Sequence, residues 1–186
     1  MSMNGYGREN ICLLREVNII RIPDGTPSTL PQGHMVTLTQ SLGGSFTVLD
    51  ETGHMVRIAG EDADALGKEP TIQTNLDSGT DPETVEKNVM EVLKTIYDPE
   101  IPVNIVELGL IYHCHVTPQG ENLNNVHVIM TLTAPGCGMG TVLQLDAENA
   151  IRGLEGVKNV RVEVVFDPPW SRERMSEAAL LQLGML

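Results

Sequence analysis

The chain has 186 residues, of which 41% are hydrophobic and 20% are charged, and these proportions are typical of globular proteins with a packed core. Its 25 acidic and 12 basic residues give a net charge of −13, which argues against nucleic acid as a partner because the phosphates would be repelled. No apolar run approaches the ~18 residues of a membrane-spanning helix, so we expect a cytoplasmic protein that does not associate with membranes.

Residues 1–70 are predicted to form a small all-β, barrel-like N-terminal domain. Residues 1–16 are a polar entry with little periodicity. The short acidic stretch Glu61–Gly67 resembles one helical turn that ends at Gly67. Residues 71–80 are polar, small and aperiodic, and we interpret them as a linker. Four short segments of the domain have the β-branched or alternating pattern of strands: Val17–Ile22, His34–Gln40, Gly44–Leu49 and His54–Ile58.

Residues 81–186 are predicted to fold as an α-β-β-α-β-α domain, which makes the chain α+β. The first helix begins with Asp81 as N-cap and Pro82 at the first helical position, and it ends before Pro99. The first two strands are expected to pair antiparallel, and the strand–helix–strand unit predicts a parallel pair, which together give a three-stranded mixed sheet. The other predicted elements are strands Leu110–Val116, Val126–Leu132 and Val160–Phe166, helix Met139–Leu154, and a last helix capped by Ser171 that runs to Leu183.

The stretch Met130–Gly140, MTLTAPGCGMG, runs from a predicted strand into a predicted helix and places Cys137 at the turn between them. The flanking Gly136 and Gly138 allow turn geometries and the close approach of another molecule to the sulfur. The following helix directs its unpaired N–H groups and positive dipole end toward this turn. A thiol there is expected to carry the thiolate character that nucleophilic attack and metal ligation require. The alternative is a buried cysteine that packs as a small hydrophobic residue.

The predicted topology allows the loop after the first helix and the turn before the second helix to lie at one end of the sheet. Asp98, Glu100, Glu107 and Cys137 would then converge, and carboxylates with a thiolate suit a transition metal at least as well as nucleophilic catalysis. The alternative interpretation treats Asp98 as a turn residue before Pro99 and Glu107 as a solvated loop residue.

The triplet His113-Cys114-His115 resembles a ligand cluster, but successive residues of a strand point to opposite faces. His113 and His115 should share one face and Cys114 the other, so ordinary sheet positions are favoured over a joint metal site. Trp170, the single tryptophan, either covers the edge of the core or contacts a partner protein.

No hydrolase, zinc-protease, P-loop or dinucleotide motif is present in the sequence, and we expect that the protein is not an enzyme. Its three cysteines, Cys12, Cys114 and Cys137, have no paired spacing, which is typical of reduced thiols. One thiolate per chain cannot complete the four-thiolate shell of an iron–sulfur cluster, so ligation would need a second subunit, a small thiol or carboxylates. Such incomplete ligation fits transient carrying.

Four motifs follow one another between residues 81 and 186: YDPEIP at 97–102, VELGLIY at 106–112, MTLTAPGC at 130–137 and VVFDPPW at 164–170. In this order they resemble the iron–sulfur cluster assembly domain of the SufT and PaaD type. The N-terminal β segment, with IPDG at 22–25 and QSLGGSFTV at 40–48, resembles the extension of the longer SufT proteins. Together the resemblances cover nearly the whole chain.

The resemblance implies a non-catalytic maturation factor, an adaptor or chaperone of the SUF system that helps deliver clusters to client apoproteins. It implies that the partners are SUF or ISC assembly proteins and client apoproteins, and it allows a homo-oligomer. As cofactor it implies a transiently held iron–sulfur cluster or iron, with none tightly bound. It assigns the functional patch to Asp98, Glu107, Thr133 and Cys137, with Cys137 as the cluster or metal contact. Many relatives have aspartate before Leu-Gly and proline after the cysteine, where this chain has Glu107 and Gly138.

A second class of function stays open from the sequence. It comprises an accessory subunit of a multicomponent oxygenase, as in the PaaD proteins, or a thiol enzyme that uses Cys137. Neighbouring genes for oxygenase subunits would favour this class, and neighbouring SUF-type genes would favour the maturation factor.

Overall fold

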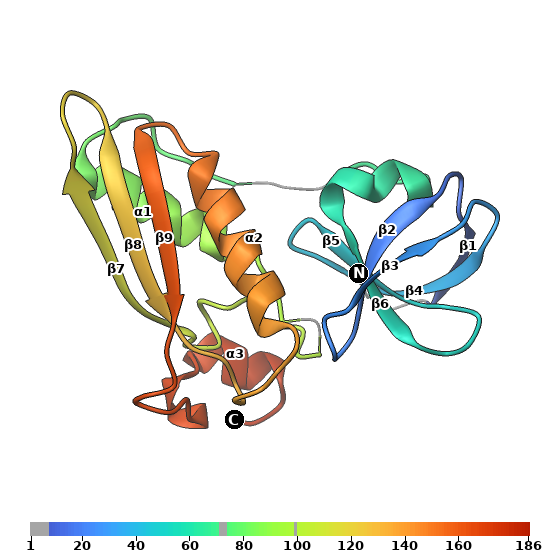
Figure 1. Ribbon diagram of the computed structural model, residues 1–186. Coiled ribbons are helices and arrows are strands. Elements are labelled where there is room, and N and C mark those ends of the chain that lie inside the picture. Colours follow the sequence, from blue (N-terminus) through green and yellow to red (C-terminus); the bar gives the residue numbers. More distant parts are fainter. Residues whose placement is uncertain (1–7, 71–73, 99) are drawn as a thin grey trace, which may run out of the picture. The chain divides into compact units, whose positions relative to one another are not determined.

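The structure is a computed structural model that describes residues 8–70, 74–98 and 100–186 (Figure 1). The chain divides into two compact units, Met1–Ile72 and Gln73–Leu186. Of the predicted linker, residues 71–73 lie outside the described residues, and residues 74–80 form no helix or strand. No helix among the described residues is long and apolar enough to cross a membrane.

The first unit contains a six-stranded antiparallel sheet with the strand order β1-β4-β5-β6-β2-β3. Alternate residues of its central strands face the core, and Val48 and Ile58 are fully buried there. The short helix η1, Gly60–Leu66, follows the last strand and ends at Gly67, which has a left-handed φ of 65°. The strands are β1 Glu9–Cys12, β2 Val17–Arg21, β3 Pro27–Leu30, β4 Met35–Leu42, β5 Ser45–Leu49 and β6 Met55–Ala59.

The four strands predicted in this unit correspond to β2, β4, β5 and β6, with ends shifted by one or two residues. Strands β1 and β3 were not predicted. Each is four residues long and lies at an edge of the sheet, and each buries one residue, Ile11 in β1 and Leu30 in β3. A single buried side chain leaves no alternation in the sequence to detect.

The second unit contains the predicted three-stranded mixed sheet, in the order β7-β8-β9. Strands β7 and β8 pair antiparallel, as predicted. Strands β8 and β9, which helix α2 connects along the chain, pair parallel, also as predicted. Helix α1 begins as predicted, because Asp81 accepts a hydrogen bond from the Thr84 N–H at 3.0 Å and Pro82 follows it. The elements are α1 Pro82–Leu93, β7 Ile111–Pro118, β8 Asn124–Met130, α2 Gly140–Arg152, β9 Val157–Val164, η2 Arg172–Arg174 and α3 Glu177–Gln182.

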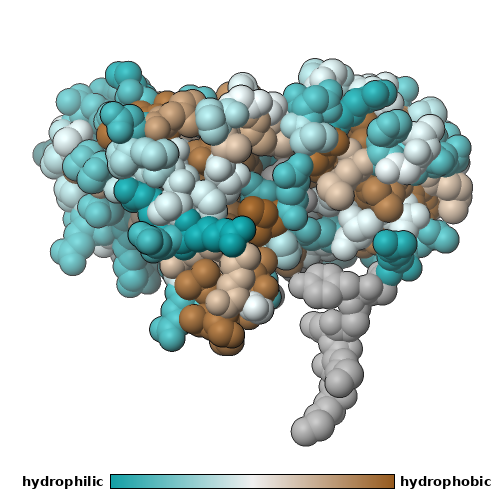
Figure 2. Space-filling view, turned by 90° about the horizontal axis from the view of Figure 1, so that it is seen from below, coloured by the Kyte–Doolittle hydropathy of each residue, from teal (hydrophilic) through white to brown (hydrophobic). Residues whose placement is uncertain are grey.

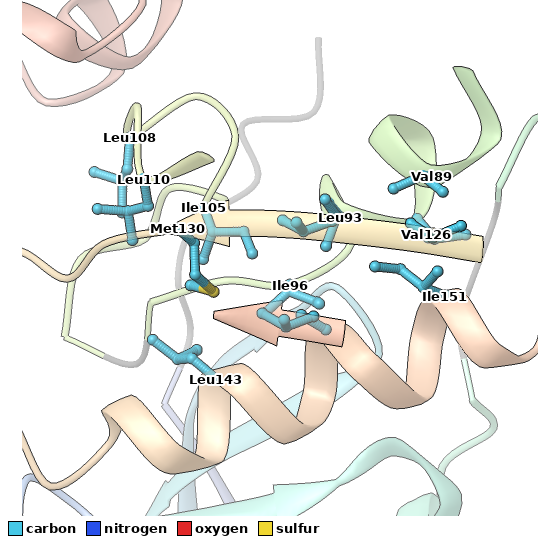
Figure 3. Packing of buried hydrophobic residues seen from close by; sticks show 14 of the residues in the cluster. Val89, Leu93, Ile96, Ile105, Leu108, Leu110, Val126, Met130, Leu143 and Ile151 are labelled. Carbon is cyan, nitrogen blue, oxygen red and sulfur yellow. The ribbon is translucent and has the colours of Figure 1, made fainter. Parts of the chain in front are cut away.

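Helices α1 and α2 pack on the same face of this sheet and form the core of the second unit with it (Figure 3). The apolar stripe of α1 supplies Val89 and Leu93, and α2 supplies Leu143 and Ile151. The opposite face of the sheet carries the exposed side chains of β7. Ile105, Leu108 and Leu110 extend the core to one end of the sheet and are fully buried.

The predicted helix from Ser171 to Leu183 is wrong. Ser171 makes no capping hydrogen bond, and only the three residues of η2 follow it before Met175 takes an extended conformation. Helix α3 then starts anew, with the Ser176 hydroxyl accepting the Ala179 N–H at 3.1 Å. The break places the Met175 side chain in the core, where it is 8% exposed, and an uninterrupted helix from Ser171 would not have this extended residue.

Candidate functional site

Three segments meet at one end of the three-stranded sheet (Figure 1). They are the acidic loop, residues 98–109 apart from residue 99, which lies outside the described residues, the thiol turn, residues 133–139, and the C-terminal segment, residues 165–186. A backbone hydrogen bond from Ser176 N–H to Glu107 C=O at 2.9 Å connects the C-terminal segment to the acidic loop, and one from Thr131 N–H to Leu110 C=O at 2.8 Å joins the residues just before the thiol turn to the residue that follows the acidic loop. This end of the unit is therefore where the predicted site residues are found.

Asp98 opens the acidic loop and is nearly buried, with 8% of its surface exposed. Its Oδ1 accepts the N–H groups of Glu100 at 2.9 Å and Ile101 at 3.0 Å, the pattern of an Asx turn. Burial raises the pKa of the Asp98 carboxyl, although these two hydrogen bonds act in the opposite direction. No salt bridge to Asp98 is present among the described residues. Asp98 thus shapes the loop, while the Glu100 side chain is exposed.

Asn104 forms a second turn of the same kind, which sequence reasoning missed. Its Oδ1 accepts the N–H groups of Val106 at 3.1 Å and Glu107 at 2.9 Å. The signal was an asparagine in a loop rich in proline and acid, but nothing local identified the N–H donors that its side chain accepts. Glu107 is thereby fixed at its backbone, while its side chain is half-buried at the surface.

The loop ends at Gly109, which has φ +72° and lies against the backbone of the C-terminal segment. A Cβ at Gly109 would be 2.1 Å from the carbonyl oxygen of Arg174, so no other residue fits without displacement. The Leu-Gly pair of the second motif therefore has a structural reason, with Leu108 fully buried in front of the glycine.

The thiol turn holds Thr133 and Cys137, both half-buried, and the Cys137 thiol is free. Gly136 has φ +79°, and a Cβ there would meet nothing within 4 Å, so the backbone beside the sulfur is open. Cys137 also contacts the core cluster, so part of the side chain packs as a hydrophobic residue. Its carbonyl accepts the Gly140 N–H at 3.0 Å, where α2 begins without a side-chain cap.

The described residues contain no group of three or more His, Cys, Asp or Glu side chains arranged to hold one metal ion. The predicted convergence of Asp98, Glu100, Glu107 and Cys137 is therefore not found as a group of metal ligands among these residues. The assignment of Asp98, Glu107, Thr133 and Cys137 to a functional patch stays a prediction.

The histidines of β7 lie as the strand alternation predicted. His113 and His115 stack on one face, with ring centroids 5.8 Å apart, and His127 of β8 lies directly across from His115. His127 contacts Glu163 of β9 at 3.3 Å. Cys114 packs against the core on the other face, and burial raises the pKa of its thiol to about 11.

Trp170 packs against the edge of the core, which is one of its two predicted roles. Its indole Nε1–H donates to the Leu108 carbonyl at 2.7 Å, so this residue also attaches the C-terminal segment to the acidic loop. Nearby, the Tyr112 hydroxyl donates to the Pro168 carbonyl at 2.7 Å, and the Arg174 guanidinium lies 4.2 Å from the centre of the Tyr112 ring.

The family model described as "Iron-sulfur cluster assembly protein" matches residues 86–164. A protein of Porphyromonas gingivalis named "Fe-S protein maturation auxiliary factor" is 43% identical over 101 residues, which cover 54% of this chain and 92% of that protein. The factor YitW of Bacillus subtilis, named in the same way, is 36% identical over 55% of this chain and 97% of its own. A crystal structure of domain of unknown function DUF59 from Bacillus anthracis is 37% identical, covers 56% of this chain and 96% of that one, and has a TM-score of 0.49.

Proposed function

Because the chain belongs to the family of iron–sulfur cluster assembly proteins, we propose that it assists the delivery of iron–sulfur clusters to client apoproteins. The observation that carries this proposal is the likeness to proteins named maturation auxiliary factors, of which the chain covers nine tenths or more. Those names describe accessory proteins and not enzymes, in keeping with the absence of a local catalytic motif in the sequence.

Cys137 is the residue that we assign to the cargo. Its thiol is free and half-buried, and the backbone beside it at Gly136 is open to an incoming molecule. A single thiolate leaves most of the ligand positions of a cluster to other donors. A cluster held in this way is bound weakly enough to be passed on, which a delivery protein requires and a storage protein does not.

Glu107 and Thr133 are proposed to complete the patch, and Asp98 to shape it. The side chains of Glu107 and Thr133 are half-buried, so each retains a surface that can contact cargo. The Asp98 carboxylate already accepts two N–H groups of its own loop, so its contribution runs through the loop conformation. The SUF or ISC machinery and apoprotein clients are the partners that this role implies.

A protein partner also fits the surface near this end of the unit. Figure 2 shows hydrophobic surface on the view from below. Toward its end the C-terminal segment exposes large hydrophobic residues, Leu181 in α3 and Met185 and Leu186 after it, at 68%, 48% and 69%. Exposed apolar side chains gathered in one place mark protein contact sites more often than ion sites.

Anaerobic reconstitution with Fe²⁺ and sulfide, followed by visible spectroscopy, tests the role of Cys137. We expect the wild type and Cys12→Ser to develop the same cluster absorption, because Cys12 lies in the other unit, and Cys137→Ser to lose it. Absorption that does not depend on Cys137 would remove the cluster contact and leave an adaptor. Apo-aconitase, added as an acceptor, then tests delivery through its recovered activity.

A further inference from the structure

The acidic loop is held both by hydrogen bonds within it and by hydrogen bonds from the C-terminal segment. Its N–H groups donate to Asp98 Oδ1, to Asn104 Oδ1 and to loop carbonyls, and the Ile105 N–H donates to the Ile96 carbonyl just before the loop. Three further loop carbonyls, those of Pro102, Glu107 and Leu108, accept donors from the C-terminal segment. The loop therefore has a complete hydrogen-bond pattern only when that segment is in place.

The three donors reach the loop near its middle and near its C-terminal end. The Gln182 side chain donates to the Pro102 carbonyl at 2.7 Å. The Ser176 N–H donates to the Glu107 carbonyl at 2.9 Å, and Trp170 Nε1–H donates to the Leu108 carbonyl at 2.7 Å. Trp170 is the donor that comes with a large packed side chain, since its ring contacts the core cluster that contains Leu108.

Glu107 is the residue most constrained by this arrangement. Its N–H is bonded to Asn104 and its C=O to Ser176, and the carbonyl of the next residue is bonded to Trp170. Gly109, two residues further, touches the Arg174 backbone. The main chain around Glu107 is thus fixed on both sides, which limits the positions that its half-exposed carboxylate can reach.

We propose that Trp170 is a positioning residue for cluster delivery, which acts by holding the main chain of the acidic loop that carries Glu107, a residue of the proposed patch. This inference rests on the proposed function and adds a residue outside the predicted patch. Trp170 does not touch the cargo. It fixes the Leu108 carbonyl, and with it the main chain that carries Glu107.

Hydrogen exchange of the loop amides tests the anchoring, with Trp170→Phe compared with Tyr112→Phe. Each variant keeps an aromatic ring and loses one donor to a carbonyl, but Tyr112 donates to Pro168, which is not part of the loop. We expect the amides of residues 100–109 to exchange about tenfold faster in Trp170→Phe, because the loss of one buried hydrogen bond shifts a local opening by roughly that factor. In Tyr112→Phe these amides should keep the wild-type rate. Wild-type exchange in Trp170→Phe would overturn the proposal.

A second pair of variants keeps the test decisive should Trp170→Phe fold poorly. Ser176 has φ −67° and ψ 156°, which proline adopts, so Ser176→Pro removes the N–H donated to Glu107 at a compatible backbone position. Ser176→Ala loses the same cap of α3 but keeps that N–H. Faster exchange of the loop in Ser176→Pro than in Ser176→Ala supports anchoring by the C-terminal segment, and equal exchange contradicts it.

Delivery to apo-aconitase separates positioning from a structural role. We expect reconstituted Trp170→Phe to hold as much cluster as the wild type but to transfer it about tenfold more slowly, the scale on which small misplacements of a reacting group act. Faster exchange with an unchanged transfer rate would make Trp170 a structural residue only. If the wild type itself transfers no cluster, the proposed function fails, while the exchange data still decide whether Trp170 anchors the loop.

Discussion

The acidic loop is held by side chains and by a second segment of the chain, whereas the thiol turn is held by its own backbone. Asp98 and Asn104 each accept two loop N–H groups, and Trp170 donates to the loop from outside. For the thiol turn, no side-chain hydrogen bond occurs among the residues that the structure describes, and α2 starts without a side-chain cap. The acidic loop, which we call one wall of the proposed site, therefore has more side-chain hydrogen bonds than the thiol turn, the other wall, and we expect it to be the more rigid.

This difference has a consequence for cluster delivery. In the proposed function, a fixed acidic loop would present the same carboxylate each time, while an open turn at Gly136 would let the Cys137 sulfur adapt to cargo that arrives and leaves. If both walls were rigid, permanent binding would be favoured, because the ligand geometry would already be fixed and no ordering cost would arise on binding. The predictions below test whether the loop is the rigid wall and the turn the adaptable one.

The largest effect is expected from alanine at the two left-handed glycines, one in each region. Gly109→Ala places a Cβ 2.1 Å from the Arg174 carbonyl oxygen at a φ of +72°, and should cost about 3 kcal/mol or more of unfolding free energy. Gly136→Ala, at φ +79° with nothing within 4 Å, should cost only the backbone strain of about 1 kcal/mol. Urea denaturation measures both. Equal costs would remove the contrast between loop and turn.

The next effect concerns thiol reactivity and compares the turn with the core. Burial raises the pKa of Cys114 to about 11, so at pH 8 only about one thiol in a thousand is ionised. Iodoacetamide should therefore modify Cys137 about a hundredfold faster than Cys114, with the exposed Cys12 as the reference for an accessible thiol. Peptide mass spectrometry after timed quenching gives the rates. Cys137 reacting as slowly as Cys114 would mean that the turn is closed.

A smaller effect is expected from removing one polar side chain from each wall. Asn104→Ala deprives the N–H groups of Val106 and Glu107 of their acceptor and should cost about 1–2 kcal/mol. Thr133→Val, in the turn, should cost about 0.5 kcal/mol or less, since surface positions without a partner tolerate substitution. Denaturant midpoints at equal m-values measure the difference. A cost at Thr133 equal to that at Asn104 would show the turn to be held as firmly as the loop.

Much of the fold could be predicted because its signals are local. The cap at Asp81, the apolar stripe of α1 and the alternation in β8 all lie within one element, and the structure has them in place. The error at the last helix arose because Ser171 and Ser176 are both acceptable N-caps, and only burial of Met175 selects the second. Local patterns cannot rank two such starts.

The candidate site was less predictable, because its contacts join distant parts of the chain. Cys137 and its glycine turn could be found from neighbouring residues alone. The bond from Trp170 to Leu108 crosses 62 residues, and the acceptor role of Asn104 depends on a loop conformation that the C-terminal segment stabilises. Sequence patterns could propose Cys137 and the acidic residues as candidates, but they could not predict the hydrogen bonds that Asn104 and Trp170 make to the loop.

The smallest effect is expected from Asp98→Asn. This variant tests whether the acidic loop needs a charge at residue 98 or only a hydrogen-bond acceptor. Burial raises the pKa of the Asp98 carboxyl in the folded protein above its value in the unfolded chain. As the pH rises between these two pKa values, the unfolded chain loses its proton first, so the free energy of unfolding falls. This loss of stability then persists at neutral pH. Asparagine keeps an oxygen for the Glu100 and Ile101 N–H groups without this penalty. We therefore expect Asp98→Asn to have a slightly higher thermal midpoint than the wild type at pH 7. This difference should vanish at a pH low enough to protonate the wild-type carboxyl. The exposed control, Glu100→Gln, should show no such trend. A less stable Asp98→Asn at pH 7 would mean that the charge itself is stabilised in the folded protein, and Asp98 would then have to be treated as a ligand and not as part of the rigid wall.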